Sequence, residues 1–287
     1  MSSPVLRVSR WRGKRTATLS LLPALALVLL VFVLPTIQLL SQSVRGAGVH
    51  GLSEYDELLH SSVVLQVLAR TVITSLGVTL VSLFLAYPYA YLMATTGARL
   101  RGIMLAVVIF SFWTPVMTRT FAWIVLLERD GPVDHLLGAV GLHGISLLHN
   151  LTGAYIGMVQ VMMPYFVLLL YSSMRTIDSQ LMVAASTLGA TRRRAFFHVY
   201  LPLTASGIES GITLVYILAL GFYLTPAVLG SPQNALMAQF IDTEISQQLN
   251  FAQAGALSTL LIVAAIVGFI VIKLLATLLR KLAGVRA

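Results

Sequence analysis

The sequence predicts an all-α polytopic membrane protein with six transmembrane helices. Of its 287 residues, 57% are hydrophobic and only 10% are charged, and the mean hydropathy is +0.89. A water-soluble domain could not bury that much apolar surface. The apolar residues fall into six long runs, and the Lys and Arg residues gather in alternate polar segments between them. That alternation is typical of a chain that crosses a membrane repeatedly with its basic loops in the cytoplasm.

Residues 1–16 contain five basic residues and no acid, which predicts a cytoplasmic N-terminus. The apolar run 17–40 is too long for the core of a signal peptide, so we interpret it as an uncleaved first span. Residues 41–66 are polar and mainly acidic, which favours an external segment with a short surface helix. The second span is predicted at 67–96, and the turn 97–102 carries two arginines and is therefore cytoplasmic.

The third span is predicted at 103–127, with a kink at Pro115 and a charged side chain, Arg119, in its outer half. Residues 128–150 are polar and mildly acidic, hence external. The fourth span is predicted at 151–174.

A basic island, the segment 175–202, separates the fourth span from the fifth, and we interpret it as two short helices joined by a hinge. Asp178 and Thr191 are suitable N-caps for the two helices. Gly189 lies between them, where a left-handed residue ends the first helix. Pro202 is expected to force the preceding residue out of helical geometry and to start the next span. Four residues at helical spacing predict an apolar face on the first helix: Leu181, Met182, Ala185 and Leu188.

The fifth span is predicted at 203–224 and contains Glu209, which is expected to form an ion pair with the basic island. The alternative for Glu209 is a role as a substrate ligand. An acidic external segment follows, then the sixth span at 251–279 and a cytoplasmic tail at 280–287. In this arrangement the cytoplasmic segments and the base of the last span hold fifteen of the nineteen basic residues. Both termini are therefore predicted in the cytoplasm, and residues 17–279 form a single membrane domain.

Several function classes find no support in the residues. The net charge of +9 does not indicate a nucleic-acid partner, because the basic residues flank apolar runs. There is no cysteine, no HExxH or comparable histidine pair, and no Gly-rich phosphate loop. We therefore expect no catalytic residue, metal or cofactor in this chain, and any ATP hydrolysis must belong to a partner.

The basic island resembles the signature of the integral membrane permease subunits of ABC importers. That signature is E-A-A, three residues, G, nine residues, I-x-L-P. Val183 stands in place of the Glu and Val199 in place of the Ile, at unchanged spacing. Five residues match in register: Ala184, Ala185, Gly189, Leu201 and Pro202.

The resemblance implies a type I ABC importer permease fold in which this loop is a cytoplasmic coupling helix that docks on a separate ATPase. The residues that it places at the docking surface are Val183, Ala184, Ala185, Gly189 and Pro202, with Arg192, Arg193 and Arg194 as electrostatic contacts.

Three further stretches resemble the branch of these permeases that serves spermidine and putrescine importers: WTPVMTRTFAWIVLLERDGPVDHLL, GFYLTPAVLG and LNFAQAGALS. This implies a bacterial inner-membrane complex with a second permease, two ATPase copies that bind ATP and Mg²⁺, and an external solute-binding protein. Membrane lipid surrounds the complex. The pathway would lie between the permeases along the fifth span, with Phe222 and Tyr223 as gate candidates and Trp113 and Arg119 beside them.

Each pathway residue has a second interpretation. The aromatic side chains could form an interfacial belt, and Arg119 could extend to the outer interface near Glu128 and Asp130. The main alternative function is a secondary carrier or channel without an ATPase, although the chain shows no internal repeat of the kind such carriers use. An intramembrane enzyme is a more distant alternative, because polar side chains in the spans are isolated.

Overall fold

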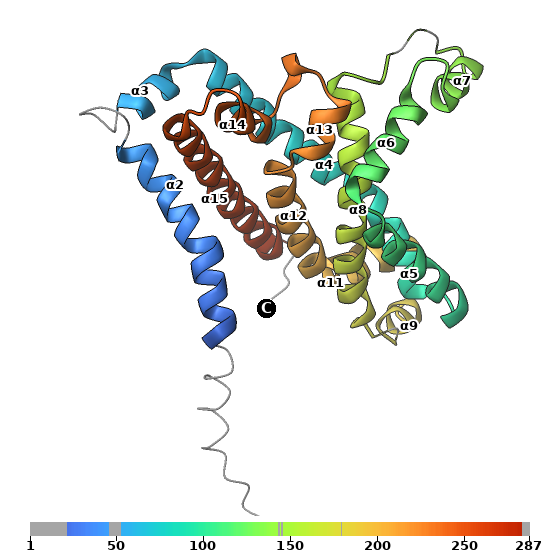
Figure 1. The fold of residues 1–287 in the computed structure, drawn as a ribbon. Coiled ribbons are helices and arrows are strands. Elements are labelled where there is room, and N and C mark those ends of the chain that lie inside the picture. The colour runs from blue at the N-terminus through green and yellow to red at the C-terminus, as the bar shows by residue number, and fades with distance from the viewer. Residues whose placement is uncertain (1–21, 46–52, 143, 145, 179, 283–287) are drawn as a thin grey trace, which may run out of the picture.

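The computed structural model describes residues 22–142, 144, 146–178 and 180–282, except for the segment 46–52. This described part is helical throughout and contains no strand (Figure 1). A helix over residues 22–45 includes a π turn at Leu29–Val33 and ends in α2 (Leu34–Arg45). The other helices of the first half are α3 (Ser53–His60), α4 (Ser62–Thr95), α5 (Ala98–Trp113), α6 (Val116–Leu127) and α7 (Pro132–Ala139).

The second half begins with the long helix α8 (Leu151–Arg175). The segment after it contains α9 (Gln180–Thr187), α10 (Arg192–Ala195), a π segment η2 (Phe196–Tyr200) and α11 (Leu201–Leu203). The remaining helices are α12 (Ala205–Leu220), α13 (Leu224–Leu229), the 3₁₀ turn η3 (Pro232–Asn234), α14 (Met237–Ser246) and α15 (Phe251–Leu282).

Six candidate membrane spans are present when each bent helix pair is taken as one span. Four are single helices that begin at Leu22, Ser62, Leu151 and Phe251. The other two are pairs: α5 with α6, bent by 99°, and the path from Arg192 to Leu203 with α12, bent by 58°. The predicted number of spans is therefore confirmed by length and composition, although two of the six are broken.

The tightly packed part of the molecule consists of α4, α8 and α12. Phe166 on α8 is fully buried, and its ring lies against Gly211 of α12, where a Cβ atom would overlap the ring. Many of the buried side chains on α4 are small, among them Ala86, Ala90 and Ser82. Small residues let membrane helices approach closely, since lipid supplies no hydrophobic force between them. We call this unit the three-helix core.

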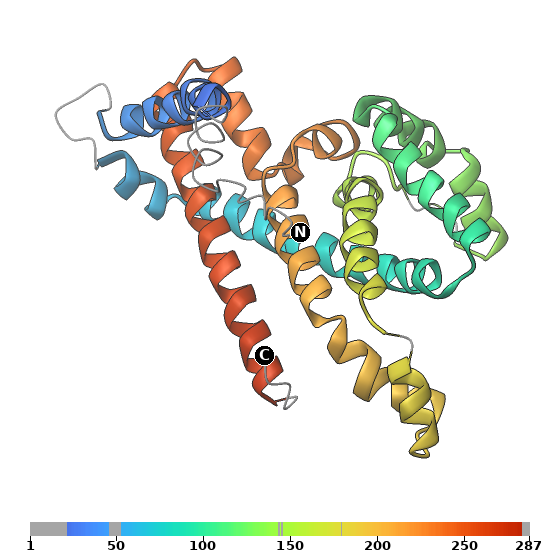
Figure 2. The ribbon, with the colours of Figure 1, turned by 90° about the horizontal axis from the view of Figure 1, so that it is seen from below.

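Helices α2 and α15 lie side by side, apart from α5 and α6 (Figures 1 and 2). None of the apolar window over residues 22–39 is buried within the chain. α15 approaches α12 closely at Gly268, where a Cβ atom would overlap the ring of Tyr216. The apolar surface of α2 is left for lipid or for another subunit.

Two predictions about prolines need correction. Pro115 does not merely kink the third span: Thr114 and Pro115 are extended, and α5 and α6 form a V (Figure 1). Pro202 does not break the chain. Leu201 is right-handed helical at φ −58° and ψ −45°, and its N–H donates to the carbonyl of Phe196. That wider π turn leaves space in the ladder for a residue without an N–H group, so the helical path continues toward α12.

Several helix boundaries in the structure also differ from the predicted ones. α2 continues to Arg45, the second span begins at Ser62, and α15 continues to Leu282. The fifth span ends at Leu220, because Gly221 leaves the helix before α13 begins at Leu224. The short surface helix predicted in 41–66 is present as α3. Residues 1–16 and 283–287, to which we assigned cytoplasmic positions, lie outside the described residues.

Candidate coupling segment and translocation surface

The basic island folds as predicted at its two helix starts and at its hinge. The carboxylate Oδ1 of Asp178 accepts from the N–H of Gln180 at 2.9 Å. The hydroxyl of Thr191 accepts from the N–H of Arg194 at 3.4 Å. Gly189 has φ +84°, the left-handed region that a residue with a Cβ atom enters at a cost. A short α9 therefore ends at a fixed turn, and α10 starts directly after it.

The outward surface of α9 carries apolar side chains in addition to polar ones. Leu188 is 88% exposed, and Val183 and Ala184 are exposed. The four residues of the predicted apolar face do not all lie on one side: Met182 packs toward the core and Ala185 is half-buried, whereas Leu181 and Leu188 face outward. A cluster of exposed apolar side chains in a polar segment indicates a surface that a partner covers.

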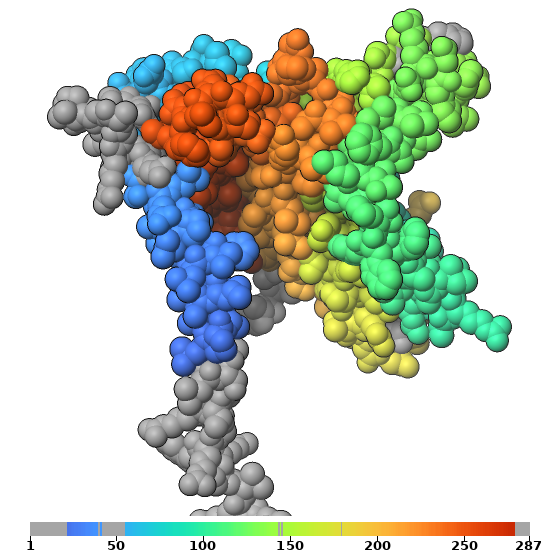
Figure 3. Space-filling view, viewed as in Figure 1, coloured from blue at the N-terminus to red at the C-terminus, as the bar shows by residue number. Residues whose placement is uncertain are grey.

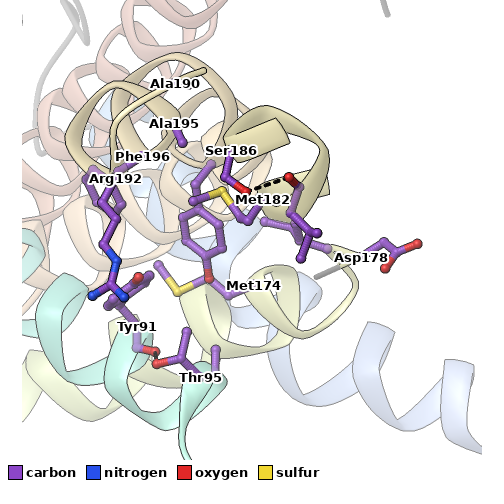
Figure 4. A pocket seen from close by; sticks show the side chains of 14 residues that line it. Tyr91, Thr95, Met174, Asp178, Met182, Ser186, Ala190, Arg192, Ala195 and Phe196 are labelled. Carbon is purple, nitrogen blue, oxygen red and sulfur yellow. Dashed lines mark hydrogen bonds between the residues drawn. The ribbon is translucent and has the colours of Figure 1, made fainter. Parts of the chain in front are cut away.

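α9 stands off from the membrane helices, as Figure 2 shows at the end of the path that leads to α12. A cavity of about 620 Å³ lies behind it. In Figure 4, Arg192 and Tyr91 lie on one side of this cavity and Asp178 on the other. α9 therefore contacts the rest of the chain mainly through the short helical turns that follow it, η2 and α10.

An aromatic cluster joins those turns to α4. The ring of Phe196 lies edge-on to Tyr91 at 5.5 Å and to Tyr87 at 6.2 Å, and it stacks on Tyr200 at 5.9 Å. At the bend before α12, the hydroxyls of Tyr87 and the fully buried Thr204 are 3.2 Å apart. A displacement of α9 therefore has two physical routes into the core, along the helical path to α12 and through the rings to α4.

α12 presents one exposed face along its length. Its members are spaced at helical intervals: Ser206, Ser210, Leu214, Ile217 and Gly221. The opposite faces of the helix pack on α8 and on α15. In Figure 3, part of α12 is visible at the surface between the two flanking groups of helices. We call these five residues the α12 face, and they are the residues of the fifth span that a pathway between two subunits would meet.

The gate candidates lie in the break between α12 and α13. Phe222 packs partly against the core, whereas Tyr223 is 39% exposed and its hydroxyl donates to Oδ2 of Asp242 at 3.0 Å. Trp113 is 84% exposed at the end of α5. Phe222 and Tyr223 are thus adjacent at one end of the α12 face, while Trp113 is on a separate helix.

Arg119 lies on α6, beside a contact with the gate segment. Its neighbour Thr120 is buried, and the hydroxyls of Thr120 and Thr225 on α13 are 3.2 Å apart. The guanidinium of Arg119 donates from Nη1 to the hydroxyl of Ser111 at 3.2 Å, and its Nε is buried without a hydrogen-bond partner. The ion pairs found among the described residues do not include Arg119.

Glu209 forms an ion pair that sequence reasoning did not assign. Its Oε1 lies 2.5 Å from Nζ of Lys273 on α15, not beside the arginines of the basic island as we predicted. The reason is helical phase: Glu209 and Tyr216 share the side of α12 that faces α15. A charge in each of two successive spans, near the same end of both, was the sequence signal available for this pairing.

These features define a class: a polytopic helical membrane subunit with an exposed docking segment linked to one face of a core helix. The comparisons with known proteins specify it further. The family "Binding-protein-dependent transport system inner membrane component" matches residues 86–284, and the chain belongs to this family.

Two similar curated proteins share the name "Spermidine/putrescine transport system permease protein PotB". The protein from Haemophilus influenzae is 31% identical over 182 residues, which are 63% of this chain and 64% of that protein. The protein from Escherichia coli K12 is 30% identical over 195 residues, or 67% and 70% of the two chains. A "Probable molybdenum ABC transporter permease protein" from Haloferax volcanii is 28% identical over 69% and 71%.

Solved structures show the same fold. A chain of a bacterial ABC transporter involved in the import of alginate superposes with a TM-score of 0.72, covering 93% of this chain and 96% of that chain at 16% identity. A chain of the MetNI methionine ABC transporter in an inward-facing conformation superposes with a TM-score of 0.54, covering 78% and 99% at 18% identity. The fold is therefore that of ABC importer permeases, as predicted.

Proposed function

We propose that the chain is one permease subunit of an ATP-driven ABC importer for a polyamine such as spermidine or putrescine. The observation that carries the transport mechanism is the exposed α9, which is followed after the turn at Gly189 by the helical path from Arg192 to Leu203 and, after a 58° bend, by α12. The polyamine assignment is supported by the similarity to the two PotB proteins. Solute would reach the chain from an external binding protein.

The proposed complex contains a second permease and two copies of a cytoplasmic ATPase that binds ATP and Mg²⁺. The ATPases would cover the exposed surface of α9, with Val183, Ala184, Ala185 and Gly189 at the contact and Arg192 to Arg194 as electrostatic partners. Because no P-loop exists in this chain, its role is non-catalytic. The complex lies in a bacterial inner membrane, with lipid around α2 and with both termini in the cytoplasm.

Transport would proceed by alternating access between two states. ATP binding closes the ATPase dimer and moves the two α9 segments together. The helical path through Pro202 and the rings around Phe196 transmit that displacement to α12 and α4. The pathway between the two permeases then opens outward to accept solute, and ATP hydrolysis returns it to the inward-open state.

Four residues are proposed at the outer end of this pathway: Phe222, Tyr223, Trp113 and Arg119. Phe222 and Tyr223 would narrow the pathway, since paired aromatic rings make a dry constriction. The link between α6 and α13 through Thr120 and Thr225 would keep Arg119 beside this gate. The candidate spans offer aromatic side chains but hardly any acid, so selectivity for an amine would be set mainly by the binding protein.

The test is ATP-driven uptake of radiolabelled putrescine and spermidine by the reconstituted complex, comparing the wild type with Gly189→Pro and Gly189→Asn. The space around Gly189 is open, so no steric clash separates the two variants. Proline differs from asparagine in its fixed φ and in lacking the N–H that donates to the carbonyl of Ser186 at 3.0 Å. Proline cannot adopt φ +84° and should abolish uptake, whereas asparagine tolerates the left-handed region and should retain it.

Unchanged ATP-dependent uptake by Gly189→Pro would refute the coupling role of the segment. Uptake that proceeds without any ATPase would place the protein among secondary carriers or channels. Selective uptake of amino acids or other small solutes instead of polyamines would refute the substrate assignment.

A further inference from the structure

Glu209 is the only Asp or Glu in the six apolar runs that form the candidate spans. A carboxylate at membrane depth is costly, and such residues usually mark a pathway or a relay. Nothing in the coupling mechanism above uses this one. It lies on the second turn of α12, in the half of the helix nearer to α9.

The surroundings of Glu209 are chemically suited to a primary ammonium group. Its Oε1 lies 2.5 Å from the ammonium of Lys273, and that ammonium lies 5.7 Å from the centre of the Phe269 ring. A carboxylate and an aromatic face are the two groups that stabilise alkylammonium ions in proteins. The present occupant of this site is the end of a lysine side chain.

The pair is placed where a solute in the pathway could reach it. Glu209 is 9% exposed, whereas the side chain of Lys273 is 49% exposed and covers the pair from outside. Ser206 and Ser210, both members of the α12 face, lie within one helical turn of Glu209. The carboxylate is therefore at the edge of the exposed face of α12, next to α15.

We propose that Glu209 is a transient binding site for an ammonium group of the transported amine, and that Lys273 is a tethered counter-ion that the amine displaces. This inference rests on the proposed function, because it requires an amine in the pathway. The end of a lysine side chain and the end of a diamine carry the same group. Exchange of one for the other therefore keeps the carboxylate paired throughout, which avoids the cost of a buried unpaired charge.

The exchange also explains why such a site would not trap its substrate. Conduction needs a site that is favourable enough to enter and weak enough to leave. A tethered ammonium competes with the amine at all times, so the amine leaves this carboxylate more readily than it would leave one without a competing ammonium. When the amine leaves, Lys273 returns to Glu209.

A purely structural ion pair between α12 and α15 makes different predictions, and the double substitution separates the two. In the reconstituted complex with saturating loaded binding protein, we would measure putrescine imported per ATP hydrolysed for the wild type, Glu209→Gln, Lys273→Met and the double variant. This ratio is informative because the binding protein, not the permease, sets the apparent affinity for free putrescine. The stimulation of ATP hydrolysis by loaded binding protein is the control for folding and docking.

For a transient ammonium site, Glu209→Gln should lower the ratio of putrescine to ATP about tenfold, as expected for the loss of one charge-assisted contact, with stimulation of hydrolysis retained. Lys273→Met should slow putrescine import, since no tethered ammonium displaces the bound amine, but it should lower the ratio less than Glu209→Gln, since the substrate itself pairs with the carboxylate. The double variant should remain as poor as Glu209→Gln. Glu209→Asp should recover part of the loss.

Restoration of the ratio in the double variant would overturn the proposal, because only a structural pair is relieved when both charges are removed. An unchanged ratio in Glu209→Gln would also overturn it and would leave the importer assignment intact. If the wild-type complex imports no polyamine, the proposed function fails and this inference fails with it.

Discussion

The three-helix core and the basic island (residues 175–202), our candidate coupling segment, differ in how their residues meet the rest of the chain. In the core, α8 and α12 approach so closely that Gly211 has no room for a Cβ atom beside Phe166. In the coupling segment, Gly189 has open space around it, Leu188 is exposed, and a cavity lies behind α9. The core is closely packed, whereas α9 has few contacts of its own, and we call α9 the lever.

This difference explains how a displacement of α9 could be transmitted to the membrane helices without unfolding any of them. Packed interiors switch between discrete arrangements and do not deform continuously. A lever with few contacts can be moved by a partner at small cost, and a rigid core then turns as a unit. The ring of Phe196 lies where the two regions join. Substitutions in the core, at this junction and on α9 should therefore have effects of different size and kind.

The largest effect on stability is expected in the core. Gly211→Val should destabilise the subunit by about 3 kcal/mol or more, since a side chain forced into a closed contact shifts the packed helices. The measurement is the thermal denaturation of the purified subunit in detergent. Gly102→Val on α5 is the matched control, because nothing lies within 4 Å of a Cβ at that position. Equal melting temperatures for the two variants would contradict the close packing of α8 on α12.

An intermediate effect is expected at the junction. Phe196→Ala should cost about 2 kcal/mol of stability, because the half-buried ring loses its contacts with Tyr91 and Tyr200. It should also reduce the solute imported per ATP hydrolysed. The control is the adjacent and more exposed Phe197, whose truncation should change both quantities less. If both alanine variants lose coupling equally, the rings around Phe196 are not the route to α4.

The smallest effect on stability is expected on the lever. Leu188→Ser should change the free energy of unfolding by less than about 0.5 kcal/mol, as is usual for exposed positions. It should nevertheless weaken the association of the ATPase with the permease, which a pull-down or surface-binding measurement would detect. Ser186→Ala, two residues away and also exposed, is the control. Loss of stability without loss of ATPase binding would mean that Leu188 packs within the subunit.

The sequence predicted the parts of this architecture that depend on local pattern. The six spans follow from the apolar runs, since each run must bury itself in lipid. The turn at Gly189 and the caps at Asp178 and Thr191 follow from backbone preferences of single residues. The spacing from Ala184 to Pro202 is sufficient to indicate the family, because it is a pattern within one short segment.

The remaining features could not be predicted in this way. Leu188 is apolar and at helical spacing, yet it faces outward, because only neighbouring helices decide which side of a short helix is covered. Pro202 was predicted to break the helix, but the π turn before it accommodates the missing N–H group. Glu209 was predicted to pair with arginines close in sequence and pairs instead with Lys273.

By itself, then, the sequence determined the membrane class, the number of spans and the position of the candidate coupling segment, because apolar length, charge alternation and single-residue backbone preferences act locally. Only the tertiary structure decided which face of α12 is exposed, which ring joins α9 to α4, and which charge neutralises Glu209. Those outcomes depend on the phase at which helices distant in the chain meet, and close packing of small residues sets that phase.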